Sequence, residues 1–580
     1  MICFEVHIDL IVEEYFRKNL KFLTSFEQIN ERIKSICGIN DFFINQEYAD
    51  EFFDKIQSRI TIVSEPDRRE YGDFQTNSIL TDSIVDYIKI KRIDFEFVLE
   101  PTCGKGNFII SALKKLPNIK KLVGVEIYQP YIWETKFKIL SLFLSSKKAN
   151  IPEIDIIHAN AFKFSYENLA KETKDYKTLV IGNPPWVTNS ELSSIDSKNL
   201  PKKSNFKKHK GLEAITGKGN FDIGENISVN LIQAFQRHVG HFAFLVKNSV
   251  IKNVIYDQKE NNFLISENEK LNIDAKKEFN VSVNASLFVS KFREKACLNC
   301  SEYDFYTKQN ITAFGWYLSK FVYSIDAYEK GYKIDGLSNI VWRSGIKHDC
   351  SKIMEFEQDN GHFTNGFKIE MQLEDNLVYG LLKSSDLKSK KTNTFRKLTI
   401  ITQKKIGQDT KYIKEYYPQT YHYLEKNNEL FKKRKSSIYK DKPPYSIFGV
   451  GDYSFAPYKV AISGLYKSTH FTLVFPKNDK PIMLDDTCYF IGFSKKRNAE
   501  IAHYILNSEL VQSFLKSIIF SDSKRAVNKD TLMRINLTKA FELSDYNKAA
   551  KSINGLSLEE WHKFAKKVEN KKETKQMTLF

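Results

Sequence analysis

Between residues 71 and 300, short apolar runs alternate with segments in which apolar residues recur at helical spacing. The runs lie at 95–100, 121–126, 155–158, 178–182 and 242–246, and their β-branched and aromatic residues favour strands. Strands that alternate with helices predict an α/β fold, a doubly wound and mostly parallel sheet. Such sheets bind ligands at the carboxyl ends of their strands, so the residues after each run are the first functional candidates.

The regions on either side of this alternation differ from it. Residues 1–70 have apolar positions three and four apart among charged ones, which predicts an N-terminal helical extension. The run 279–292 is rich in β-branched and aromatic residues without a following helix, so we expect an antiparallel hairpin at the sheet edge. In 301–580 strand and helix signals are mixed, which predicts a separate α+β domain.

Composition and charge narrow the class of protein. The 580 residues suffice for about two to four domains, and 42% hydrophobic with 13% aromatic residues exclude a disordered chain. A net charge of +17 is a hint of a polyanionic partner. The seven cysteines are sparse and favour reduced thiols, and no stretch approaches a membrane span. We therefore expect a cytoplasmic protein without a metal site.

The segment Asn183-Pro184-Pro185-Trp186 follows the apolar run 178–182. Its prolines fix the backbone and lack N–H donors, so carbonyl acceptors remain, and the Asn183 side chain adds another. Trp186 offers a flat face for stacking. This set suits an exocyclic amine, whose two hydrogens meet two acceptors while its ring lies on an aromatic plane. The alternative is a strand-end turn with a buried tryptophan.

Two further strand ends carry candidate binding chemistry. Glu100 ends the run 95–100 and precedes Gly104 and Gly106, which allow a tight turn close to a ligand. The turn lacks the third glycine of the dinucleotide fingerprint and the Lys-Ser/Thr of a P-loop, and its acid favours a cationic or amino-bearing ligand. Glu126 ends the next run and can accept both hydroxyls of a ribose. Together the three strand ends predict a nucleoside pocket beside an amine-binding loop.

In this order, the motifs resemble those of the gamma-type adenine-N6 DNA methyltransferases of restriction–modification systems. These are single chains with a C-terminal target recognition domain. The resemblance implies a class I S-adenosylmethionine-dependent methyltransferase domain over 71–300 and a target recognition domain over 301–580. It also implies methyl transfer from S-adenosylmethionine to N6 of a flipped-out adenine in double-stranded DNA.

The resemblance assigns roles to individual residues. Thr76 would help to hold the methionine end of the cofactor, although Asn77 replaces the proline that usually follows, and Asn160 replaces the usual aspartate at the third strand end. Trp186 and Phe279 would form the two sides of the target-base pocket. The residues implied in cofactor binding are Thr76, Glu100, Pro101, Cys103, Gly104, Gly106, Phe108, Glu126, Ile127, Asn160, Ala161 and Phe162.

Three basic segments are candidates for DNA contact, and for each the alternative is a solvated charged face. The first follows the amine-binding loop, the second has aromatic neighbours, and the third resembles a recurring segment of large recognition domains. The candidates are Lys202, Lys203, Lys207, Lys208, Lys432, Lys433, Arg434, Lys524 and Arg525.

Other functions stay open at this point. The chain could be a modification subunit that needs a separate specificity chain, a protein glutamine N5-methyltransferase, or an inactive methyltransferase fold that binds DNA. The long region after the motifs argues against the first two, and the intact Glu100, Glu126 and Asn183 argue against the third. We expect a monomer, with any restriction endonuclease encoded separately.

Overall fold

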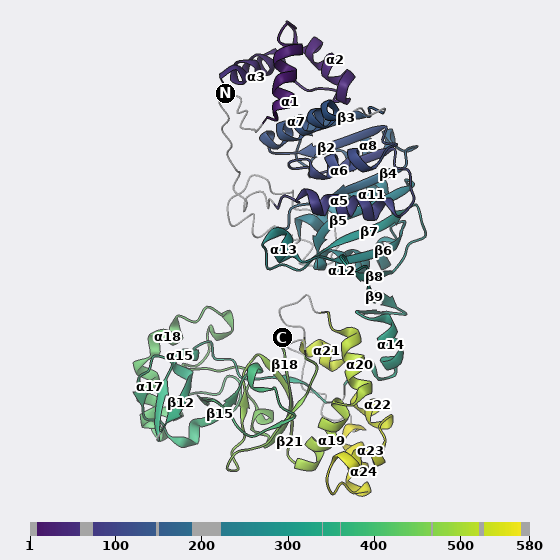
Figure 1. Cartoon of the computed structure of the whole chain (residues 1–580). Helices are drawn as coiled ribbons and strands as arrows, with labels where there is room; N and C mark the ends of the chain where they lie inside the picture. The colour runs from purple at the N-terminus through teal and green to yellow at the C-terminus, as the bar shows by residue number, and fades with distance from the viewer. Residues whose placement is uncertain are drawn as a thin grey trace. The chain divides into compact units, whose positions relative to one another are not determined.

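The computed structural model describes residues 8–58, 74–146, 150–187, 222–338, 340–359, 361–465, 468–520 and 527–569. The chain divides into two compact units, Met1–Phe321 and Val322–Phe580 (Figure 1). Among the helices in these ranges, none has the length and apolar composition needed to cross a membrane.

The first unit is built on a ten-stranded sheet with the order β10-β9-β8-β6-β7-β5-β4-β1-β2-β3. All five predicted runs form parallel strands of this sheet, namely β1 (Phe97–Glu100), β2 (Lys121–Glu126), β3 (Glu153–His158), β4 (Thr178–Gly182) and β5 (Gly240–Lys247). β1 pairs with β2 on one side and with β4 on the other. The predicted doubly wound parallel sheet is therefore confirmed, with its switch point beside β1.

Helices cover both faces of this sheet. One layer holds α5 (Ser78–Lys89), α6 (Asn107–Lys115) and α7 (Gln129–Ser145), and the other holds α8 (Tyr166–Glu172), α11 (Ile223–Phe235) and α12 (Asn248–Asn261). The chain adds strands in one direction from β1 to β3 and in the opposite direction from β4 to β5. Because crossovers between parallel strands are right-handed, this reversal moves the later helices to the other face of the sheet. Each connection from strand to helix thus reaches the same edge of the sheet.

The predicted edge hairpin is wrong in its position. Phe279 ends α13 (Ala275–Phe279), and β7 (Ala285–Phe292) runs antiparallel between β5 and β6 (Ile265–Asn272) in the interior of the sheet. The sheet continues through β8 (Asn299–Asp304), β9 (Asn310–Tyr317) and β10 (Lys320–Val322). The domain boundary expected at residue 300 consequently falls inside this sheet. β8 and β9 are partly exposed and lack the continuous apolar runs of buried parallel strands.

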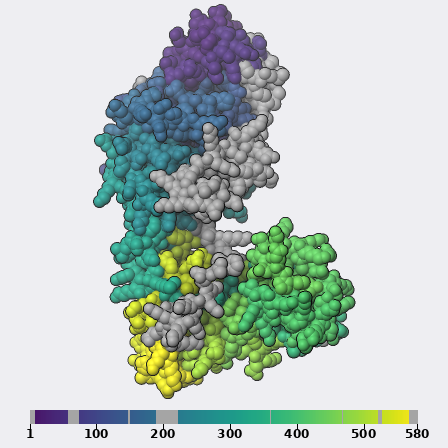
Figure 2. All heavy atoms as spheres, turned by 180° about the vertical axis from the view of Figure 1, so that it is seen from behind, coloured from purple at the N-terminus to yellow at the C-terminus, as the bar shows by residue number. Residues whose placement is uncertain are grey.

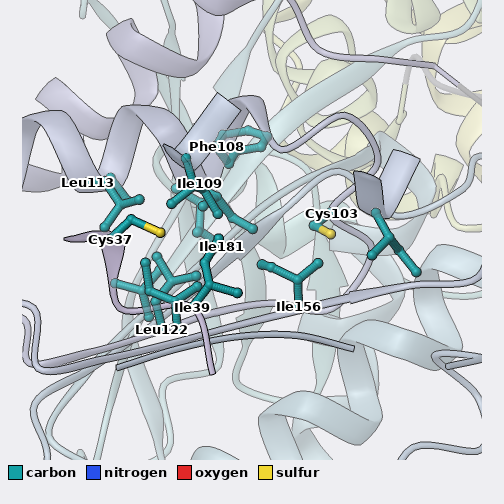
Figure 3. Packing of buried hydrophobic residues seen from close by; sticks show 14 of the residues in the cluster. Cys37, Ile39, Cys103, Phe108, Ile109, Leu113, Leu122, Ile156 and Ile181 are labelled. Atoms are coloured by element: carbon teal, nitrogen blue, oxygen red, sulfur yellow. The ribbon is translucent and has the colours of Figure 1, made fainter. Parts of the chain in front are cut away.

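The N-terminal extension is helical where the structure describes it, with α1 (Leu10–Tyr15), a π-helical turn (Phe16–Leu20), α2 (Phe26–Cys37) and α3 (Gln46–Ser58). α1 and α2 contact α7, and Figure 2 shows these purple helices over the blue part of the unit. Cys37 and Ile39 lie among Ile109, Leu113 and Leu122 in the shared core (Figure 3). The extension is therefore an integral layer of the first unit.

A buried lysine ties the extension to α7. The Lys136 Nζ donates hydrogen bonds to the carbonyls of Asp41 (2.6 Å) and Phe42 (3.0 Å) and lies 5.1 Å from the Trp133 ring centroid. Burial lowers the pKa of Lys136 to about 8. These carbonyls lie in the connection between α2 and α3, so the desolvated Lys136 cation holds the extension against α7.

The second unit has two sheets and a set of helices, which agrees with the predicted α+β class. One sheet has the order β11-β21-β18-β19-β16 and the other β14-β13-β12-β17-β15-β20. The strands are β11 (Arg343–Ser344), β12 (Glu355–Asp359), β13 (His362–Asn365), β14 (Glu370–Met371), β15 (Val378–Leu382), β16 (Lys391–Thr392), β17 (Lys397–Ile400), β18 (Tyr458–Ser463), β19 (Thr472–Val474), β20 (Met483–Leu484) and β21 (Cys488–Phe493). The helices are α14 (Ile325–Gly331), α15 (Ser351–Met354), α16 (Tyr412–Tyr416), α17 (Pro418–Lys426), α18 (Asn428–Lys432), α19 (Lys496–Leu506), α20 (Glu509–Ile518), α21 (Lys529–Met533), α22 (Leu537–Glu542), α23 (Tyr546–Ser552) and α24 (Leu558–Glu569).

Candidate active site

A pocket opens at the carboxyl ends of β1 to β4, where the switch point of the sheet lies. Counted with its open mouth, it encloses about 1000 Å³. Eleven of the twelve residues predicted to bind a cofactor line it, together with Asn183 and Pro185. The motifs that are far apart in the sequence therefore meet in one cavity. The other lining residues, outside the predicted set, are Phe74, Gln75, Thr102, Asn107, Val125, Tyr128, Tyr131, Ala159, Val187, Ile223 and Ile227.

The exception is Gly106, which shapes the turn without lining the pocket. Gly104 and Gly106 have φ values of +50° and +72°, a region that L side chains rarely adopt. A Cβ on Gly106 would lie 2.6 Å from the Thr135 side chain of α7, and one on Gly104 would lie 2.6 Å from the Gln75 amide. Gly106 thus permits close packing of α6 on α7, and Gly104 permits the backbone to approach the pocket.

Glu126 holds the glycine turn from the neighbouring strand. One oxygen accepts the Gly104 N–H at 2.8 Å, and the other accepts the N–H groups of Ile127 and Tyr128 at 2.8 Å each. These bonds fix the carboxylate at the pocket wall. Its predicted role toward ribose hydroxyls stays a prediction, and the bonds give it a second task, the alignment of the turn.

Glu100 is a buried carboxyl group at the base of the pocket. It is 3% exposed, and its Oε2 has no hydrogen-bond partner among the described residues. Burial raises the pKa of Glu100 well above its ordinary value, and the nearby Glu126 charge adds to this effect. An unsatisfied buried acceptor costs about 1–3 kcal/mol. A positively charged ligand group would remove this cost and restore the ionised form.

The Asn183 amide presents one acceptor without a partner. Its Nδ2 donates to the Phe74 carbonyl at 2.8 Å and to the Thr76 Oγ1 at 3.2 Å. The Phe74 carbonyl accepts only, so the opposite amide orientation would place two oxygens together. The Oδ1 is buried and has no hydrogen-bond partner among the described residues. The fold therefore holds a single carbonyl oxygen ready for an external N–H donor.

Trp186 and Phe279 do not form the two separate walls that the sequence predicted. The Trp186 Nε1 donates to the Leu245 carbonyl at 3.1 Å, and the side chain is 4% exposed. Its ring lies edge-on to Phe279, with centroids 4.9 Å apart and an interplanar angle of 70°. Rings this close leave no space for a base between them. In this structure Trp186 anchors the loop on β5, and a base could enter only after one ring moves.

An ion pair between Lys247 and Asp222 lies beside the Asn-Pro-Pro-Trp loop. The Lys247 Nζ lies 2.8 Å from the Asp222 Oδ2, while the Asp222 Oδ1 accepts the Gly224 N–H at 2.9 Å. Burial raises the pKa of Asp222, and Lys247 opposes this shift. The Ile223 N–H donates to the Val187 carbonyl at 3.0 Å. The start of α11 and the end of β5 therefore brace the Asn-Pro-Pro-Trp loop. No local sequence signal marks these residues, because they meet only after folding.

The predicted DNA contacts have different outcomes. Lys202, Lys203, Lys207, Lys208, Lys524 and Arg525 lie outside the described residues. Lys433 is exposed, and Lys432 pairs with Glu429 at 2.7 Å. The Arg434 guanidinium turns inward, where it donates to the Ser446 carbonyl at 2.7 Å and lies 3.7 Å from the Tyr439 ring centroid. Its donors thus serve the fold, and its expected role in binding DNA is not supported by its placement.

Comparisons with known proteins bear on the activity. Residues 60–272 match the family model described as N-6 DNA Methylase. The Type II methyltransferase M.NspV of Nostoc sp. (strain ATCC 29411 / PCC 7524) is 38% identical over 479 residues, which are 82% of this chain and 97% of that protein. Among solved structures, the Type IIL restriction-modification enzyme MmeI in complex with DNA is similar with a TM-score of 0.48 and 13% identity, over 94% of this chain and 74% of that one. The type IIG restriction endonuclease BpuSI is similar with a TM-score of 0.32 and 12% identity, over 87% and 65% of the two chains.

Proposed function

The chain belongs to the N-6 DNA methylase family, and we propose that it is a site-specific DNA methyltransferase of a restriction–modification system. Its membership confirms the family predicted from the motifs. The proposed reaction transfers a methyl group from S-adenosylmethionine to N6 of an adenine in double-stranded DNA. The observation that carries this proposal is the Asn183 amide, whose N–H groups are both taken while its buried Oδ1 has no partner in the described part of the chain.

The pocket fits S-adenosylmethionine by its own chemistry. The Glu100 Oε2, which has no hydrogen-bond partner among the described residues, suits a positively charged group, and the Gly104 turn admits a ligand where a side chain would meet Gln75. Glu126 stands at the end of β2, and Ile127 and Phe162 offer apolar surface for a purine. When bound there, S-adenosylmethionine supplies a methyl group on a positively charged sulfur. We infer that these residues orient it toward Asn183.

Asn183 acts on the amine that receives the methyl group. Its Oδ1 accepts one N–H of the adenine amine, and the Pro184 carbonyl accepts the other. Two acceptors on two N–H bonds draw the nitrogen lone pair out of conjugation with the ring, which makes it a better nucleophile. The rest of the rate enhancement comes from positioning and from dipoles that are already oriented.

A paired adenine must leave the duplex to reach Asn183, at a cost of a few kcal/mol. Stacking on an aromatic side chain returns about 1–3 kcal/mol per base. Since Trp186 and Phe279 contact each other, we infer that base entry separates these rings. We also infer that the chain acts as a monomer with a separately encoded endonuclease.

Single-molecule sequencing of DNA from cells that express the chain tests the proposal. The wild type should produce N6-methyladenine in one sequence motif, Asn183→Ala should abolish it, and the exposed Asn230→Ala should retain it. Absence of the mark with the wild type, while the purified protein still binds S-adenosylmethionine, would contradict the DNA acceptor. N4-methylcytosine at the mapped motif would reassign the amine. An unchanged mark in Asn183→Ala would remove Asn183 from the mechanism.

A further inference from the structure

A basic turn with an apolar tip follows β17 in the second unit. In this turn, Gln403–Gln408, Lys404 and Lys405 are exposed and Ile406 is 52% exposed. Neither lysine forms an ion pair within the described residues. A single exposed isoleucine is common on protein surfaces, so its surroundings decide whether it has a function. We call this segment the Ile406 turn.

The Ile406 turn is held rigid by its own glutamines. The Gln408 Oε1 accepts the Lys404 N–H at 2.7 Å, and the Gln408 N–H donates to the Lys405 carbonyl at 3.1 Å. Gln403 is fully buried, and it donates to the Gln408 carbonyl and accepts the Ile447 N–H at 2.9 Å. A preorganised turn loses little conformational entropy on binding. The hydrogen bonds of Gln403 and Gln408 therefore hold the turn in a conformation that exposes Ile406 to solvent.

A second lysine-rich segment lies against this turn. The Thr402 and Thr410 hydroxyls donate to the carbonyls of Tyr445 and Pro444, each at 2.7 Å. Just before these carbonyls the chain carries two exposed lysines, and two more flank Arg434, which bonds the Ser446 carbonyl. The result is a rim of six exposed lysines without ion pairs among the described residues, formed by Lys404, Lys405, Lys433, Lys435, Lys440 and Lys442.

Fewer carboxylates than lysines lie on these segments. Residues 402–411 and 429–442 carry eight lysines and three carboxylates. Asp409 lies 3.8 Å from Lys411, Glu429 pairs with Lys432, and the exposed Asp441 lies between Lys440 and Lys442 in the sequence. Unpaired like charges repel one another, so such a rim favours an anionic partner. The partner must also offer apolar surface between its anionic groups, because Ile406 stands among the cations. Duplex DNA has this arrangement, with phosphates on both sides of a groove and base edges between them.

On the basis of the proposed function, we propose that the Ile406 turn is a DNA contact of the second unit. The lysine rim binds phosphates, and the Ile406 side chain packs against bases in the groove between them. Apolar side chains of this size are inserted at base steps or contact thymine methyl groups in known complexes. The proposal moves the expected contact away from the inward-facing Arg434 and onto its exposed neighbours.

Two variants with matched controls test the proposal by fluorescence anisotropy of the full chain. The probes are a short duplex with the motif mapped for the wild type and a scrambled duplex. Lys404→Ala/Lys405→Ala should weaken binding to both and lower the salt slope of log affinity by about 2. The control, Lys330→Ala/Lys333→Ala, removes two exposed lysines of the same unit and should leave the slope unchanged.

Ile406→Ser should lower affinity for the motif duplex about tenfold with an unchanged salt slope, since it removes an apolar contact and no charge. The control is Ile369→Ser, because Ile369 is 54% exposed in the same unit. Thermal unfolding verifies that each variant is folded. Equal affinities of Ile406→Ser and Ile369→Ser would overturn the proposed base contact, and equal slopes of the two lysine pairs would overturn the rim. A wild type that binds neither duplex and methylates no DNA would instead refute the proposed function.

Discussion

Replacement of Glu100 by glutamine should stabilise the ligand-free protein while it weakens cofactor binding. The carboxyl is 3% exposed and its Oε2 has no partner among the described residues. Because burial raises the pKa of Glu100 in the folded state, the folded state binds the proton more tightly than the unfolded state does. The contribution of this group to stability is therefore present below the unfolded pKa and is lost as pH rises through the folded pKa.

Glutamine keeps the shape of the side chain and carries no charge, so the Glu100→Gln variant does not lose stability as pH rises through the folded pKa of Glu100. We expect Glu100→Gln to raise the unfolding free energy of the first unit at pH 7 by about 1–4 kcal/mol, because the wild type loses about 1.4 kcal/mol for each pH unit between the unfolded pKa and the pH at which the folded carboxyl ionises. The gain should shrink as pH approaches the ordinary carboxyl range. Affinity for S-adenosylmethionine should fall by about 10- to 100-fold, since a hydrogen bond to a charged group contributes about 1.5–3 kcal/mol.

Glu126→Gln provides a control with the opposite expected sign. Its carboxylate accepts three backbone N–H groups, and an amide NH2 in place of one oxygen would face a donor. This variant should be less stable than the wild type. Scanning calorimetry of the ligand-free proteins across the neutral to acidic range, with titration calorimetry of S-adenosylmethionine, measures both effects. A destabilised Glu100→Gln at pH 7, or one with wild-type affinity for S-adenosylmethionine, would refute the reasoning.

Three further predictions concern bracing, acid stability and the turn. Lys247→Met leaves Asp222 as a buried acid without its ion pair and should cost about 3–5 kcal/mol of stability. It should also lower kcat more than it lowers the affinity for S-adenosylmethionine. The double variant Lys247→Met/Asp222→Asn should recover most of the lost stability and most of the lost kcat. Burial lowers the pKa of His241 to about 4, so stability should fall as pH drops below about 6.5, and His241→Gln should flatten that loss in denaturant titrations. Gly106→Ala places a Cβ 2.6 Å from Thr135 at φ +72° and should cost about 1–3 kcal/mol, measured by thermal unfolding; an unchanged midpoint would contradict the clash.

Sequence patterns predicted the part of the site that is local to strand ends. Glu100 and Glu126 end the strands β1 and β2, and Gly104 lies in the turn after β1. Parallel neighbours bring such residues together at one edge of the sheet. The prediction of the pocket required only that these residues lie at the carboxyl ends of parallel strands. Gly106 belongs to the same turn, but its space is limited by Thr135 from α7, a contact that no spacing in the chain reveals.

The features that the sequence did not predict depend on contacts between residues far apart in the chain. Trp186 satisfies its N–H on β5 and touches Phe279 from α13, so an aromatic that the motif marks for stacking is also a packing residue. The strands β8 and β9 are partly exposed and mix polar with apolar residues, so the chain after residue 300 resembled the start of another domain. Arg434 lies in a basic run whose neighbours are exposed, and only the fold shows that its donors meet a backbone carbonyl.

Hydrogen-bond satisfaction separates these cases on one physical criterion. A folded chain gains little by keeping a buried acceptor without a partner, so Glu100 Oε2 and Asn183 Oδ1 make sense as groups whose partners arrive with ligands. Asn183 shows the contrast within one amide, since its Nδ2 is fully used by the fold and its Oδ1 is not. The criterion also applies to the basic residues of the second unit. Arg434 donates to backbone carbonyls and holds structure, whereas Lys404 and Lys405, which belong to the Ile406 turn, form no ion pair among the described residues. Other buried atoms without a partner among these residues, such as the His241 nitrogens, lie in the core. The criterion therefore indicates function only where such a group also faces the pocket or a surface that a ligand can reach.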